Sequence, residues 1–113
     1  MKILGIDPGA RTAISCIQDD KVIGVEVVDL NKIKVDKILH YYNTIKTLLA
    51  CKFNPEVVYC EEPFMPPKFP QAGKSMNKKL AIIELVCQEL GIPYKFINPS
   101  VVKMTVTVNG KAL

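Results

Sequence analysis

The sequence predicts an α/β domain with a five-stranded mixed sheet, in which three antiparallel strands are followed by two parallel strands and helices flank the sheet. Three observations lead to this fold class. Apolar and β-branched segments joined by short turns fill the first 28 residues. Apolar residues then recur at helical spacing in two later segments. A short apolar segment follows each of these helices, as crossover connections to parallel strands require, so we expect helices on both faces of the sheet.

The first strand organises the domain. Residues 3–6 are apolar apart from Gly5 and lead directly into Asp7, and Pro8-Gly9 forms the turn that follows. This pattern predicts a central strand buried on both faces, with Asp7 at or near its end. A buried carboxylate needs a metal, a cation or hydrogen bonds to compensate it, which makes Asp7 a candidate functional residue. Equally, Asp7 can cap the turn through backbone N–H groups, as Asp often does.

The next elements follow from turns and periodicity. Residues 12–17 and 22–28 are predicted strands joined by a hairpin turn at residues 18–21. A helix is expected over residues 35–51, where apolar residues recur at helical spacing, and Asn54-Pro55 ends it.

The second half continues this alternation. We predict a strand over residues 56–61 and a proline-dense loop over residues 62–73. A helix follows from Ser75 or Met76 to Leu90, with Gly91 as its C-cap. Residues 92–97 are the fifth predicted strand. The β-branched segment 101–108 is compatible with a short helix or a strand.

Composition narrows the class of protein. The 113 residues suffice for one small domain, residues 1–113, and no apolar segment approaches the length of a membrane span. The four cysteines are scattered without a CxxC pair, which argues against a zinc site or a disulfide framework and favours a reducing cytoplasm.

The net charge is +4, and residues 64–113 hold seven lysines against two glutamates. This excess favours a polyanionic partner, although it is also compatible with an ordinary solvated surface.

Two acids occupy matching positions. Asp7 lies on the first strand, and Glu61 ends the fourth. If these strands are parallel neighbours, both carboxylates reach the carboxyl edge of the sheet, where α/β domains bind ligands. Carboxylate oxygens suit Mg²⁺ or Mn²⁺, and two such ions can support phosphodiester cleavage. The simpler interpretation is that Glu61 begins a polar loop.

The proline-dense loop and the helix after it combine lysines with aromatic residues. Lysines can neutralise phosphates, and an aromatic ring can stack on bases or insert between them. The alternative is a solvated loop before a helix. The candidate DNA-binding residues in this region are Phe64, Lys68, Phe69, Lys74, Lys78 and Lys79.

These motifs resemble the RuvC family of Holliday junction resolvases, which have an RNase H-like, or retroviral-integrase-like, fold. Residues 4–9, Leu-Gly-Ile-Asp-Pro-Gly, resemble the family's first strand and catalytic Asp, and residues 61–65, Glu-Glu-Pro-Phe-Met, resemble its second motif. The resemblance implies catalysis by Asp7 and Glu61 through Mg²⁺, with Mn²⁺ as the other candidate, and insertion of Phe64 at a four-way DNA junction. Residues 98–103 resemble the family's DNA-contacting segment and implicate Lys103, and Lys111 matches a second basic position. A homodimer through residues 81–88 is also implied.

One departure from the family bears on catalysis. RuvC-like proteins carry two further acids on a C-terminal helix, whereas no acid follows Glu89 here. The resemblance therefore implies either the core of a longer nuclease or a junction-binding module that does not cut. It also implies a sheet with part of its apolar surface exposed or covered by a neighbouring chain. A different class, the actin-like and sugar-kinase-like ATPases, also opens with an Asp-x-Gly loop, but the second phosphate loop that such proteins need is not visible.

Overall fold

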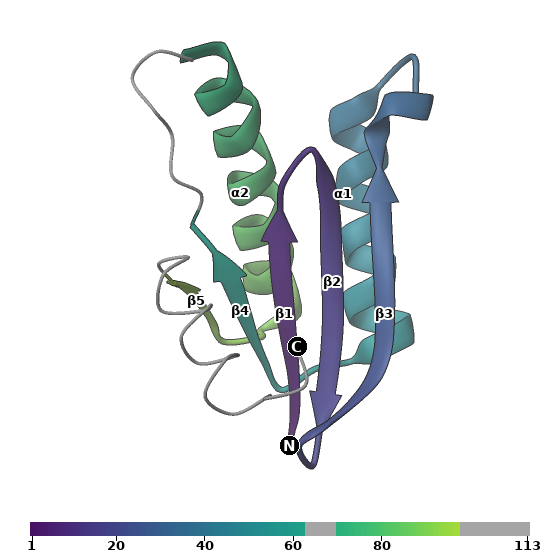
Figure 1. The fold of residues 1–113 in the computed structure, drawn as a ribbon, viewed down its shortest axis with the longest axis vertical. Coiled ribbons are helices and arrows are strands. Elements are labelled where there is room, and N and C mark those ends of the chain that lie inside the picture. Colours follow the sequence, from purple (N-terminus) through teal and green to yellow (C-terminus); the bar gives the residue numbers. More distant parts are fainter. Residues whose placement is uncertain (63–69, 98–113) are drawn as a thin grey trace.

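The computed structural model describes residues 1–62 and 70–97, with the backbone alone over residues 70–76. The strands are β1 (Lys2–Pro8), β2 (Arg11–Gln18), β3 (Lys21–Asp29), β4 (Val57–Glu61) and β5 (Tyr94–Ile97). The helices are α1 (Lys37–Thr47), which continues as a π-helical segment (Leu48–Phe53), and α2 (Pro70–Leu90); a 3₁₀ turn (Leu30–Lys32) follows β3. The strands form one sheet in the order β3-β2-β1-β4-β5 (Figure 1).

The sheet has the predicted mixture of strand directions. β1 pairs antiparallel with β2, and β2 pairs antiparallel with β3. β4 is parallel to both β1 and β5. The β2–β3 hairpin turns at Asp19 and Asp20, whose φ angles of 53° and 64° are the pair of positive values that a type I′ turn needs. The predicted fold class is therefore confirmed.

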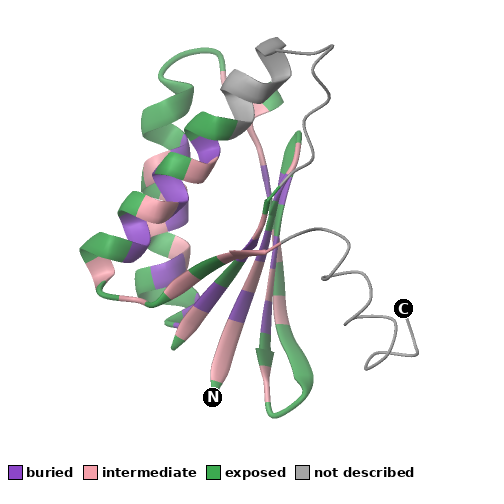
Figure 2. Ribbon diagram, turned by 90° about the vertical axis from the view of Figure 1, so that its left-hand side faces the viewer, coloured by how far each residue is buried: buried purple, intermediate pink, exposed green. Residues whose placement is uncertain are grey.

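Both helices lie on the same side of the sheet, and our expectation of helices on both faces is wrong for the described residues (Figure 2). The handedness of the crossovers explains the difference. The chain passes from β3 to β4 through α1 and from β4 to β5 through α2, and both steps move the same way across the sheet. Because both connections join parallel strands and both are right-handed, they place their helices on one face.

Side chains along the strands alternate between the two faces. On the side that we call the helix face, they pack against α1 and α2, as Leu4, Ile14 and Val58 do with no exposed area. The side that we call the open face carries Asp7 and Glu61, together with apolar residues of β3. Among the latter, Ile23, Val25 and Val27 are at least half exposed.

The two ends of the first helix illustrate how local chemistry sets the boundaries. The helix begins after Asp36, two residues later than the start predicted at Val35, because Asp36 adopts a left-handed conformation with φ of 52°. The π-helical segment ends at Phe53, and the next residue, Asn54, is also left-handed and donates its N–H to the carbonyl oxygen of Leu49 at 3.0 Å. Its last side chain, Phe53, packs over Gly24, where a Cβ would lie 2.7 Å from the ring. The predicted stop at Asn54-Pro55 is confirmed.

The second helix is longer at its N-terminal end than predicted. It begins at Pro70 rather than at Ser75 or Met76, which is consistent with the preference of proline for the first turn of a helix. It ends at Leu90 as predicted, and Gly91 follows with φ of 69°, a left-handed conformation that glycine adopts at little cost. No helix in the described part of the chain is long and apolar enough to cross a membrane.

Candidate active site

Asp7 lies near the carboxyl end of the central strand and is exposed. It pairs with Ala13 of β2 and belongs to the open face, because its neighbours Ile6 and Pro8 are buried on the helix face. β1 is therefore not buried on both faces as predicted, since its burial alternates. The penalty for burying a lone carboxylate does not arise, and Asp7 is accessible to a ligand in solvent.

Glu61 lies beside Asp7 in the sheet. The parallel register pairs Ile6 with Cys60, so that Asp7 and Glu61 follow as the next residues on adjacent strands. Cys60 is buried on the helix face, and the alternation along β4 therefore directs Glu61 to the open face. The predicted juxtaposition of the two acids at the carboxyl ends of β1 and β4 is what the topology produces.

The pKa of the buried Cys60 thiol is affected by both carboxylates. Burial is the main cause that raises the pKa of this thiol, to about 12, and the negative charges of Cys87, Asp7 and Glu61 raise it further. Both acids are therefore close enough to act electrostatically on a single group. At neutral pH the thiol keeps its proton, so that it adds no anionic ligand to the two carboxylates.

The donor set partly fits a divalent cation. Two carboxylates at one edge of the sheet provide the oxygen ligands that Mg²⁺ and Mn²⁺ prefer. Within residues 1–62 and the described side chains of α2 and β5, no three acidic, His or Cys residues gather into a metal-binding group. The chemistry of the donors therefore suits such an ion, and the described residues offer two carboxylates for it.

The residues predicted to bind DNA fall into three groups: two lysines of α2, one largely buried lysine of the same helix, and residues outside the described part of the chain. Lys78 is exposed on α2, and Lys74 lies in the first part of the same helix. Lys79 is nine-tenths buried, and its ammonium donates a hydrogen bond to the carbonyl oxygen of Gly9 at 2.9 Å. Five of the predicted DNA-binding residues lie outside the described residues: Phe64, Lys68, Phe69, Lys103 and Lys111.

The sequence did not predict the buried network behind the β1–β2 turn, which consists of Thr12, Tyr41 and Lys79. The hydroxyl groups of Thr12 and Tyr41 share a hydrogen bond of 2.7 Å, and the ammonium of Lys79 lies 5.9 Å from the centre of the Tyr41 ring. The helical spacing contained a signal for Lys79, because Ile83 and Val86 follow it at intervals of four and three residues on the buried stripe.

Arg11 is a second cation that the sequence did not single out. It begins β2, on the same face as Asp7, and its guanidinium forms an ion pair with Asp29 of β3 at 3.4 Å. The Arg11 side chain is 72% exposed, so this pair stabilises the fold little, and the guanidinium remains accessible to an anion.

A mixed sheet of this order, β3-β2-β1-β4-β5 with both helices on one face, has the architecture of an RNase H-like domain. The model of the family described as crossover junction endodeoxyribonuclease RuvC matches residues 3–113. The chain therefore belongs to the RuvC family, as the resemblance of its motifs implied. This family assignment does not favour the ATPase alternative.

Solved structures agree with this assignment at the level of the fold. T. thermophilus RuvC in complex with a Holliday junction substrate is 22% identical, with a TM-score of 0.81 over 94% of this chain and 69% of that one. A structure of Thermus thermophilus RuvC is 21% identical, with a TM-score of 0.78 over 100% and 73% of the two chains. The yeast mitochondrial Holliday junction resolvase Ydc2 is 18% identical, with a TM-score of 0.64 over 94% and 54%. No curated protein sequence matched the chain significantly.

Proposed function

We propose that this protein is a divalent-metal-dependent endonuclease that cuts four-way DNA junctions, with Asp7 and Glu61 as its catalytic carboxylates. The observation that carries the proposal is the position of these two acids, on adjacent parallel strands and on one face of the sheet, in a member of the RuvC family. Two neighbouring carboxylates repel each other, and a cation between them relieves that repulsion.

The chain's own residues would bind and orient the reacting groups. Asp7 and Glu61 would hold Mg²⁺, or Mn²⁺ in its place, and further oxygen ligands would come from water or from groups outside the described residues. When bound, such an ion supplies an activated water and stabilises the leaving oxygen of a phosphodiester. The two strands contribute rigidity, because a ladder of hydrogen bonds fixes the backbone at both acids.

The DNA would approach from the carboxyl ends of β1 and β4. The N-terminal end of α2 lies at this same end of the sheet (Figure 1). Lys74 and Lys78 on that helix would neutralise backbone phosphates, together with Lys68, Lys103 and Lys111. Phe64 and Phe69 would stack on bases or insert at the junction. T. thermophilus RuvC has been solved with a Holliday junction substrate, and the shared fold supports the same class of DNA for this chain.

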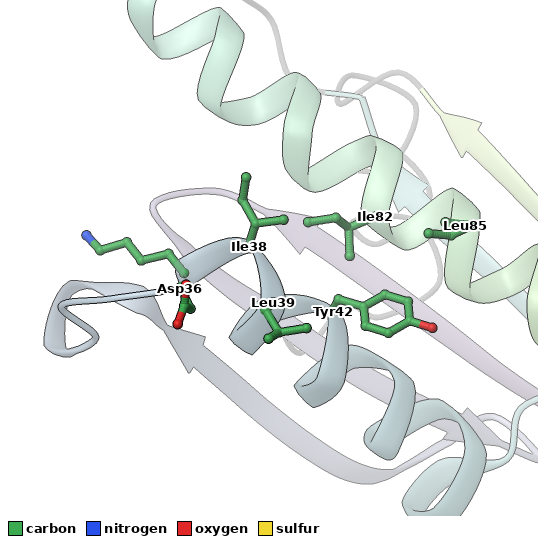
Figure 3. A pocket seen from close by; sticks show the side chains of 7 residues that line it. Asp36, Ile38, Leu39, Tyr42, Ile82 and Leu85 are labelled. Carbon is green, nitrogen blue, oxygen red and sulfur yellow. The ribbon is translucent and has the colours of Figure 1, made fainter.

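A homodimer through α2 matches the two-fold symmetry of a four-way junction. An apolar groove of about 690 Å³ runs between α1 and α2, and Ile38 and Tyr42 face Ile82 across it (Figure 3). Leu39 and Leu85, which also line the groove, are about half exposed. We propose that a second copy of the chain covers this surface.

All four cysteines are free, which is consistent with the reducing cytoplasm as the site of action.

Cleavage of a labelled synthetic four-way junction tests this function. With Mg²⁺, the wild-type protein is expected to make paired cuts in the junction and to leave linear duplex intact. Asp7→Asn is expected to lose at least about 100-fold in rate, since even outer partners of metal ligands contribute factors of 10–100. The matched control is Asp19→Asn, an exposed Asp in the β2–β3 turn, at the opposite end of β2 from the β1–β2 turn. Equal rates for wild type and Asp7→Asn would refute the proposal.

The second candidate function is junction binding without cleavage. It is favoured by the presence of only two carboxylates at the site among the described residues. A gel shift of the four-way junction, at protein concentrations that produce no cut in Mg²⁺ or Mn²⁺, would establish this candidate in place of the first.

A further inference from the structure

Lys79 is the one lysine of α2 that the structure places inside the protein rather than on its surface, among those whose side chains it describes. Its residue is nine-tenths buried, whereas the preceding Lys78 is exposed. The Lys79 ammonium donates to the carbonyl oxygen of Gly9 and lies over the ring of Tyr41. These contacts join the second helix to the turn between β1 and β2.

A buried ammonium is costly, so its retention at this position calls for a local reason. Burial lowers the pKa of Lys79, and the negative charge of Asp29 opposes that shift. An apolar side chain of similar length would fill the same space without this desolvation penalty. Three groups compensate the charge here: the Gly9 carbonyl, the Tyr41 ring and the Asp29 carboxylate.

The carbonyl of Gly9, to which Lys79 donates, lies two residues after Asp7, the first proposed catalytic carboxylate. Gly9 begins the short connection from β1 to β2, and a Cβ at this glycine would lie 3.6 Å from the Oδ1 atom of Asp7. On the other side of the connection, Thr12 is hydrogen-bonded to Tyr41 of α1. Helices α1 and α2 therefore hold the two sides of the same turn, and Lys79 contacts both the turn and Tyr41.

We infer that Lys79 is a positioning residue for Asp7. Its ammonium fixes the Gly9 carbonyl, and through this turn it fixes the orientation of the Asp7 carboxylate toward a divalent cation. Lys78, in contrast, faces solvent and contacts DNA phosphates. The inference rests on the proposed metal-binding role of Asp7, and it removes Lys79 from the set of phosphate contacts that the sequence predicts.

Neighbouring lysines on one helix provide a matched pair of variants. Lys79→Met removes the charge and keeps most of the length of the side chain, and Lys78→Met makes the same change at the exposed position. Binding of Mn²⁺ is followed by the paramagnetic broadening of the Asp7 and Gly9 amide signals in NMR spectra. Junction affinity is measured separately without a divalent ion, and the thermal midpoint checks that each variant folds.

The two variants are expected to act on different quantities. Lys79→Met should raise the Mn²⁺ concentration at half-broadening by about 10-fold or more, the range for groups that orient metal ligands, with junction affinity within about twofold. Lys78→Met should leave the Mn²⁺ midpoint unchanged and weaken junction binding more at low salt than at high salt. Lys79→Arg retains a charged donor and should restore most of the metal affinity. If Lys79→Met does not fold, Lys79→Gln, which keeps a donor without the charge, replaces it.

The outcomes separate this inference from the proposed function. A wild-type Mn²⁺ midpoint in folded Lys79→Met overturns the inference, and a loss of junction affinity equal to that of Lys78→Met would make Lys79 a phosphate contact instead. If Mn²⁺ fails to broaden Asp7 in the wild type, the metal site itself is refuted. The turn is then still tested by amide hydrogen exchange at residues 9–12. Faster exchange in Lys79→Met would support the inference that Lys79 stabilises the β1–β2 turn, and unchanged exchange would contradict it.

Discussion

The two faces of the sheet are made by the same strands and serve different purposes. On the helix face, side chains such as Leu4, Ile14 and Val58 have no exposed area. On the open face, Asp7 is exposed and Glu61 is half-buried, and β3 presents apolar side chains to solvent within the described residues. Adjacent residues therefore differ sharply, as with the buried thiol of Cys60 and the carboxylate of Glu61 that follows it. Alternation along a strand therefore separates the side chains that build the core from the two candidate carboxylates.

The largest expected difference between the faces concerns stability. Ile14→Ala on the helix face should lower the free energy of unfolding by about 2–5 kcal/mol, because it removes fully buried atoms and leaves a cavity. Ile23→Ala on the open face, where the side chain is 50% exposed, should cost less than about 1 kcal/mol. Urea denaturation of both variants measures the contrast. Similar costs would mean that the open face is as well covered as the helix face.

The buried network behind the β1–β2 turn sharpens the comparison. Tyr41→Phe leaves the hydroxyl of Thr12 buried without its partner, which should cost about 1–3 kcal/mol of unfolding free energy. The control is Tyr42→Phe on the same helix, where the lost hydroxyl bonds to Glu89 at an exposed position. This control should cost less than about 1 kcal/mol, because water replaces the hydrogen bond. Equal costs in chemical denaturation would show that the Thr12–Tyr41 pair is accessible to water.

Much of the fold follows from the sequence because its signals are local. Two aspartates with the φ values of a type I′ turn, a left-handed Asn54 and a left-handed Gly91 all occur where the sequence predicts a turn or a helix end. The alternation of strands and helices then fixes the parallel pairing of β1 and β4, and hence the neighbouring positions of Asp7 and Glu61.

The features that the sequence did not predict depend on how segments far apart in the chain pack together. That both helices share one face follows from the order of strands in the sheet, which is a property of the whole chain. The burial of Lys79 depends on Tyr41 and Gly9, which are 38 and 70 residues away in the sequence. A lysine between charged and apolar residues resembles a surface residue until the packing of its helix is known. Charge composition alone therefore assigned Lys78 and Lys79 to the same role.

The last effect concerns pH and a buried thiol of α2. Burial raises the pKa of the Cys87 thiol to about 11, above the value of 9.0 for an accessible thiol. As the pH rises above 9, the unfolded chain releases this proton before the folded chain does, so the stability falls until the pH passes 11. Urea denaturation at pH 8 to 11 in a reducing buffer should therefore show a steeper loss of stability for wild type than for Cys87→Ala. Parallel curves would contradict the burial of this thiol.

Calorimetric titration with Mn²⁺ tests the central claim most directly, that Asp7 and Glu61 from neighbouring strands hold one cation. Asp7→Asn and Glu61→Gln should each weaken binding by at least about 10-fold, and the double variant should lose little more than either single one, because groups that share one ligand are not additive. Glu62→Gln, which changes the exposed neighbouring residue, should bind like wild type. Unchanged affinity in either single variant, or losses that multiply in the double variant, would contradict a shared site.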